Sequence, residues 1–86
     1  MCTYLTEKVD LAGSGKGAAG WFPLTEATVY FDHPQHAPAD HTLYIDVRNP
    51  GQGPSARIAV ELTAESARVL AAAIEAALAA APPGLA

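Results

Sequence analysis

Apolar and polar residues alternate along four stretches of the chain, and a period of two is typical of β-strands that bury one face. The stretches cover residues 2–11, 26–33, 41–48 and 55–62. The third is the most regular, because Leu43, Ile45 and Val47 alternate there with polar residues and a tyrosine. Glu7 departs from the pattern and falls on the apolar side of the first stretch. The alternation predicts four strands with one common apolar face.

A period of about 3.6 residues replaces the alternation after Thr63 and predicts a helix with one apolar stripe. The stripe consists of Ala67, Leu70, Ala71, Ile74, Ala77, Leu78 and Ala81. Thr63 is the expected N-cap, Glu65 suits the positive end of the helix dipole, and two prolines end the helix near Ala81. Alanine also fills much of the remaining circumference. Either high helix propensity or burial against a second copy of the chain explains this abundance.

Turn-forming residues separate the predicted strands and fix the fold class. Residues 49–54 contain two prolines and two glycines, which is typical of a tight turn. Residues 13–20 contain four glycines and predict a flexible connection. The order of elements predicts an α+β fold, a four-stranded antiparallel β-meander followed by one C-terminal α-helix packed on the sheet. Residues 1–86 show no internal boundary, so we expect a single domain.

The chain is short, so its hydrophobic core provides only a small margin of stability. Its 86 residues bury only about 60–65% of the surface that the unfolded chain exposes. Domains of this size often gain stability from a metal, from disulfides or from a partner subunit. A disulfide within the chain is excluded because Cys2 is the only cysteine, and a lone thiol suits a reducing compartment. We therefore expect a bound metal or a homo-oligomer.

The charge distribution argues against binding to nucleic acid or to a membrane. The net charge is −4, and the five basic residues are scattered rather than clustered as a phosphate-binding surface requires. The first residues have neither an apolar run nor a basic leader. The longest apolar stretch, residues 69–81, contains Glu75 and is shorter than the roughly 20 residues of a membrane span. These features predict a cytoplasmic protein.

All three histidines of the chain lie within nine residues, at His33, His36 and His41. His33 continues the apolar face of the second predicted strand and His41 that of the third, so a hairpin would bring both rings to one side of its mouth. His36 lies in the connection, where Pro34 and Pro38 restrict the backbone. Imidazole is the commonest protein ligand for zinc. The cluster predicts a site for zinc or another divalent transition metal.

Other interpretations of this cluster stay open, because its spacing is not an established zinc signature. Asp32 and Asp40 flank the outer histidines and could bind the metal or orient the imidazoles. Cys2 or Glu7 could complete the ligand set if the first strand lies beside the hairpin. In one alternative, His33 and His41 lie at strand ends and His36 lies in a solvated loop, and none of them binds a ligand. In another, the histidines have a metal-free catalytic or pH-sensing role.

Two further functions compete with metal binding. Cys2 and Glu7 are candidate catalytic residues. In a cysteine-dependent enzyme, Cys2 would react with a nearby histidine as its base, or removal of Met1 would expose an N-terminal thiol whose own amine acts as the base. An incidental thiol is the simpler interpretation. Trp21 and Phe22 either plug one end of the sheet or form a platform for a small molecule or partner protein. The platform would make the protein a metal-free binding or accessory module.

Several segments of the chain resemble a family of short uncharacterised bacterial proteins. They are Met1-Cys2-Thr3-Tyr4, Ala12-Gly13-Ser14-Gly15-Lys16-Gly17, Gly20-Trp21-Phe22, Tyr30-Phe31-Asp32-His33-Pro34-Gln35-His36-Ala37-Pro38 and Ala59-Val60-Glu61-Leu62. The resemblance covers nearly the whole chain. The family is a domain of unknown function, so the resemblance implies a compact bacterial cytosolic protein and supplies no activity and no catalytic residues.

Overall fold

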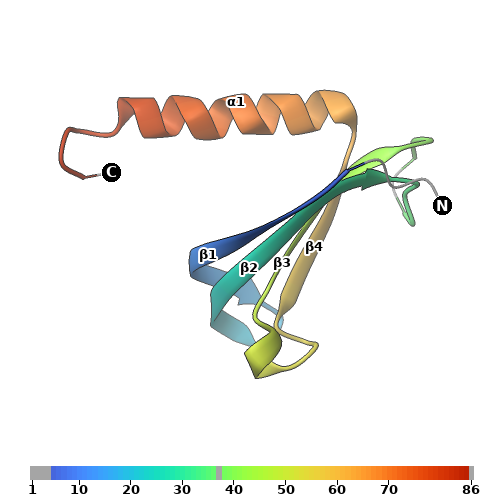
Figure 1. The fold of residues 1–86 in the computed structure, drawn as a ribbon, viewed down its shortest axis with the longest axis horizontal. Helices are drawn as coiled ribbons and strands as arrows, with labels where there is room; N and C mark the ends of the chain where they lie inside the picture. Colours follow the sequence, from blue (N-terminus) through green and yellow to red (C-terminus); the bar gives the residue numbers. More distant parts are fainter. Residues whose placement is uncertain (1–4, 37, 86) are drawn as a thin grey trace.

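A computed structural model describes residues 5–36 and 38–85 of the chain. The elements follow one another as β1 (Thr6–Gly17), β2 (Gly20–Asp32), β3 (Thr42–Arg48), the short 3-10 helix η1 (Pro50–Gln52), β4 (Arg57–Leu62) and α1 (Ala64–Ala80) (Figure 1). Each strand pairs antiparallel with the next, in the order β1-β2-β3-β4. The helix contacts β3 and β4. The predicted α+β meander with a C-terminal helix is therefore confirmed.

The glycine-rich segment 13–20 is part of the sheet, so the predicted flexible connection is wrong. β1 continues to Gly17 and β2 begins at Gly20, and only Ala18 and Ala19 form the turn between them. Gly20 has a φ of 117°, which residues with a Cβ rarely adopt. The alternation was invisible in the sequence because a glycine presents no side chain to either face.

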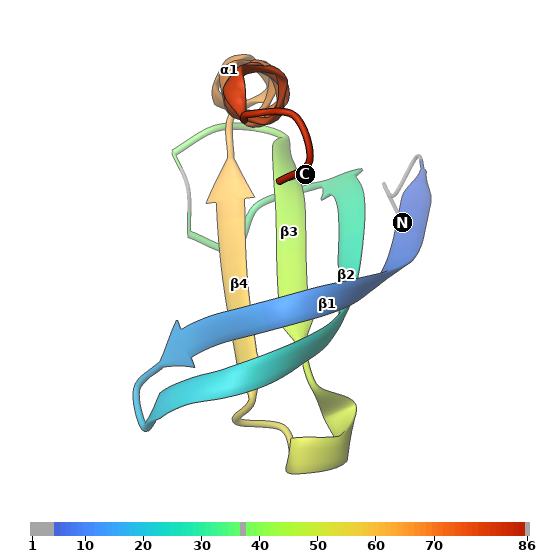
Figure 2. The ribbon, with the colours of Figure 1, turned by 90° about the vertical axis from the view of Figure 1, so that its left-hand side faces the viewer.

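The outer half of the β1–β2 hairpin folds across one face of the sheet (Figure 2). A shift of register between Asp10 and Gly13 marks a β-bulge, which bends a strand and increases its twist. Gly15 is buried, and a Cβ at this position would lie 3.1 Å from Ile58 Cδ1 and 3.2 Å from Leu24 Cδ2. The absence of a side chain at position 15 thus allows β1 to pack closely against β4.

The pairing register assigns the strand residues to two faces with different chemistry. The apolar face carries Val9, Ala27, Val29, Phe31, Leu43, Ile45, Val47, Ile58, Val60 and Leu62. The opposite face carries Lys8, Asp10, Glu26, Thr28, Tyr30, Tyr44, Asp46, Arg48, Arg57, Ala59 and Glu61. Glu7 lies on the apolar face, as predicted, but on the edge strand, where its side chain is exposed.

Helix α1 begins as the sequence predicted and covers only part of the apolar face. Thr63 Oγ1 accepts a hydrogen bond of 3.1 Å from the backbone N–H of Ser66. The helix then extends away from the sheet (Figure 1). Among the described residues, Ala27, Tyr44 and Ala56 are the only apolar ones that are buried. No helix in the described ranges is long and apolar enough to span a bilayer.

A substitution at Gly15 tests the close packing of the hairpin. We expect Gly15→Val to lower the free energy of unfolding by about 1–3 kcal/mol, because its methyl groups would displace Ile58 and Leu24. Gly13→Val is the matched control, since a Cβ there meets nothing within 4 Å, and should change stability by about 0.5 kcal/mol or less. Urea unfolding followed by circular dichroism measures both. Equal losses would contradict the packing.

Candidate functional site

The two outer histidines meet at the mouth of the β2–β3 hairpin, which confirms the prediction from strand alternation. The ring centroids of His33 and His41 are 4.4 Å apart, and the planes are tilted by 32°. The ring of His41 also stacks on Phe31 at 5.8 Å. Nδ1 of His33 lies 3.1 Å from the backbone carbonyl oxygen of Asp40, and Oδ1 of Asp32 accepts from the backbone N–H of His33 at 2.7 Å.

His36 lies apart from this pair, in a hollow on the polar face of the sheet. The described ranges 5–36 and 38–85 contain no group of three or more His, Cys, Asp or Glu residues that could hold a metal ion. The structure thus joins two of the three predicted ligands. Cys2, proposed as a further ligand and as a nucleophile, lies outside the described residues.

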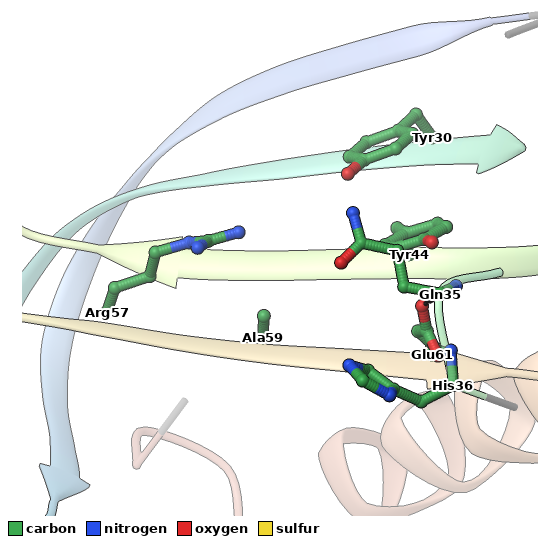
Figure 3. A pocket seen from close by; sticks show the side chains of 7 residues that line it. All are labelled: Tyr30, Gln35, His36, Tyr44, Arg57, Ala59 and Glu61. Carbon is green, nitrogen blue, oxygen red and sulfur yellow. Dashed lines mark hydrogen bonds between the residues drawn. The ribbon is translucent and has the colours of Figure 1, made fainter.

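The hollow on the polar face has a volume of about 560 Å³ and opens to solvent (Figure 3). Strands β2, β3 and β4 and the loop after β2 contribute its lining residues, Tyr30, Gln35, His36, Tyr44, Arg57, Ala59 and Glu61. Arg57, Ala59 and Glu61 follow one another on this face of β4. The methyl group of Ala59 leaves a gap between two long charged side chains, and this gap is the floor of the hollow.

The carboxylate of Glu61 fixes the histidine-bearing loop over the polar face. Its Oε2 accepts from the backbone N–H of Gln35 at 2.6 Å, and its Oε1 accepts from the backbone N–H of His36 at 3.0 Å. The hydroxyl of Tyr44 donates to the carbonyl oxygen of His33 at 2.8 Å. Hydrogen bonds to an ionised acceptor are stronger than neutral ones. These three bonds therefore hold Gln35 and His36 at the rim of the hollow.

Two stacked tyrosines form a wall at one end of the hollow (Figure 3). The rings of Tyr30 and Tyr44 are 4.7 Å apart and nearly parallel, at 5°. Hydrogen bonding to the Glu61 carboxylate raises the pKa of Tyr44 to about 12, and burial of the hydroxyl and repulsion by the same carboxylate add to this shift. The phenol is thus protonated up to a higher pH than an ordinary tyrosine, and its hydroxyl donates to the loop.

An ion pair holds Arg57 at the other end of the hollow. Its Nε lies 2.9 and 2.8 Å from the two carboxylate oxygens of Asp46, and its Nη2 lies 2.7 Å from Oδ2. Hydrogen bonding to Asp46 raises the pKa of Arg57, whose guanidinium is charged at neutral pH in any case. This contact orients a planar group of donors along the sheet (Figure 3).

The sequence did not identify most of this hollow. Tyr30, Tyr44, Arg57 and Glu61 are single polar residues on three strands, and their proximity depends on the pairing register. Their positions on the non-apolar side of each strand were the one available signal. Trp21, in contrast, was expected to plug the sheet or form a platform, and it is 70% exposed at the outer end of the hairpin. The plug interpretation is therefore wrong for Trp21.

The pKa of Tyr44 predicts how stability depends on pH. The folded protein holds the Tyr44 proton more tightly than the unfolded chain does, with a pKa of about 12 against 10.0. This stabilisation is fully present below pH 10.0 and is lost as the pH rises through about 12. We expect Glu61→Gln to return the pKa of Tyr44 toward 10.0 and to reduce the loss in this window.

The absorbance of tyrosinate during an alkaline titration measures this effect, together with urea unfolding at each pH. Tyr44→Phe is the control, because it should remove the group that titrates late. Identical titrations of the wild-type protein and Glu61→Gln would contradict the role of the carboxylate.

Comparisons with known proteins give one match. The model of a family of unknown function, DUF6295, matches residues 1–86. No curated protein and no solved structure matches the chain. The match covers the whole chain and agrees with the resemblance seen in its sequence segments. The chain belongs to the DUF6295 family.

Proposed function

We propose that this protein is a binding module, and that the hollow on the polar face of its sheet holds a small planar molecule with hydrogen-bond acceptors along its edge. The observation that carries the proposal is the fixation of the loop by Glu61, because two backbone hydrogen bonds place Gln35 and His36 beside the hollow before any ligand arrives. A site that is ordered in advance loses less entropy on binding.

The lining of the hollow favours a flat ligand with acceptor atoms. Ala59 provides a floor without a long side chain, and Tyr30 and Tyr44 provide an aromatic wall. Arg57 presents the guanidinium N–H groups that do not contact Asp46, and Gln35 adds a side-chain amide. The volume of about 560 Å³ is within the range of about 300–1,000 Å³ that small-molecule sites occupy.

Benzoate and benzamidine test this proposal, because they have nearly the same shape but present acceptors and donors respectively. We expect benzoate to shift the amide resonances of Gln35, His36 and residues 57–61. With nine heavy atoms, it should bind with a dissociation constant on the order of 1–10 mM. Two-dimensional NMR of the labelled protein measures the shifts and the affinity.

Ala59→Phe should abolish the benzoate shifts, because its ring would fill the floor of the hollow. Ala76→Phe is the matched control on the exposed helix and should leave them unchanged. Equal binding of benzamidine would contradict the acceptor preference. The proposal would be wrong if neither compound shifted the amides of this face.

Metal binding through the hairpin mouth is a second candidate function, and the contact between the rings of His33 and His41 favours it. Two imidazoles supply half of a tetrahedral zinc site. Cys2, water or substrate would have to supply the other ligands. Bound zinc would add folding free energy to a domain with a small core.

Zinc titration of metal-free protein without a histidine tag tests this second candidate. We expect about one zinc per chain and a higher Tm for the wild-type protein, and both effects should disappear in His33→Ala and His41→Ala. His36→Ala is the matched control, because His36 lies in the other site. A Tm that does not change with zinc would contradict the metal site, and loss of the effect in His36→Ala would favour the three-histidine set.

A further inference from the structure

The chain exposes more surface than a compact monomer of its mass. Its accessible surface is 6265 Å². A folded monomer of 8.9 kDa exposes about 4,800 Å². The radius of gyration is 14.4 Å, whereas a compact domain of this length has a radius of about 12 Å. The excess surface is about 1,450 Å² per chain.

Exposed apolar side chains lie where α1 and the sheet diverge. Residues of the helix and of the sheet line a cleft of about 330 Å³ there, and they are Ala67, Arg68, Leu70, Ala71, Ile74, Val29, Leu43 and Ile45. Beyond the cleft, the helix continues away from the sheet (Figure 1). Leu70, Ile74 and Leu78 remain 41%, 53% and 57% exposed. The helix therefore offers an apolar stripe that its own sheet does not cover.

We infer that a second copy of this chain covers the stripe, with the two α1 helices packed antiparallel. An obligate homodimer interface buries about 1,000–2,500 Å² on each partner, and the excess surface of the chain lies in this range. The described part of the chain buries only three apolar residues, and domains with so small a core often gain stability from a partner subunit. A second copy is the one partner that is always present when the chain is made.

The charges on α1 agree with an antiparallel pair. Arg68 and Glu75 lie seven residues apart, on one side of the helix and about 10 Å from each other along its axis. The midpoint between them falls within one residue of the centre of Ala64–Ala80. An antiparallel copy with full overlap therefore places each Arg68 opposite a Glu75 of the other helix. The described residues of the chain itself supply neither charge with an ion-pair partner.

This charge pattern allows a test of both the dimer and the antiparallel orientation of its two helices. Sedimentation equilibrium should give a mass of about 18 kDa for the wild-type protein, twice that of the chain. Arg68→Glu and Glu75→Arg should each weaken the dimer by about ten- to one hundred-fold, because like charges then face each other twice. An equimolar mixture of the two variants should regain wild-type affinity, since one chain then carries two acidic and the other two basic residues.

Two further variants keep the result clear. Ile74→Asp should produce a monomer, because it places a charge in the stripe, whereas Ala76→Asp on the other side of the helix should stay dimeric. Circular dichroism checks that each variant is folded. A wild-type protein that stays at 8.9 kDa would overturn the inference. So would a dimer whose affinity neither the charge variants nor Ile74→Asp reduce.

Discussion

The cross-strand register of β2, β3 and β4 is the constraint on which every other feature of this structure depends. The backbone pairs place Val29, Ile45 and Val60 in one row and Tyr30, Tyr44 and Glu61 in the next. Because side chains alternate along a strand, a slip by one residue would exchange the two faces. The register therefore determines both the apolar face, which other elements must cover, and the polar face, on which we propose a ligand site.

Charged side chains order the polar face of the sheet. Glu61 binds two backbone N–H groups of the loop, and Asp46 orients Arg57. Lys8 and Arg48 also lie 3.2 and 3.5 Å from Glu26 on the same face. Ion pairs near the surface add little stability, but the ion pair of Asp46 and the hydrogen bonds of Glu61 fix the positions of other groups. Their role is to shape the hollow around Ala59.

The apolar face is only partly covered, because the chain supplies only two elements to pack on it. The curled β1–β2 hairpin packs on the end near Ile58, which requires a glycine at position 15. Helix α1 packs near Leu43 and then leaves the sheet. The surface between these two covers stays open in the single chain. The two faces thus serve different ends, with the ligand proposed on one and the second copy inferred on the other.

The sequence by itself determined the element types, the order of the strands, the helix N-cap at Thr63 and the meeting of His33 with His41. The elements and the histidine pair follow from local periodicity and from the parity of two adjacent strands, and the N-cap follows from the hydroxyl group of Thr63. The sequence did not reveal that β1 continues through glycines to Gly17, because alternation needs side chains to be visible. It also grouped His36 with the other histidines, although His36 lies on the opposite face of the sheet.

Only the tertiary structure decided which distant residues share a site. Glu61 is 25 residues from His36, and Arg57 is 11 residues from Asp46, so no local pattern connects these pairs. The sequence also did not predict which side of the helix is exposed, because an alanine-rich sequence predicts a helix but not its angle to the sheet. Local residue patterns fix backbone conformation, whereas register, curvature and the helix angle depend on the packing of the whole chain, and these three decide where the sites lie.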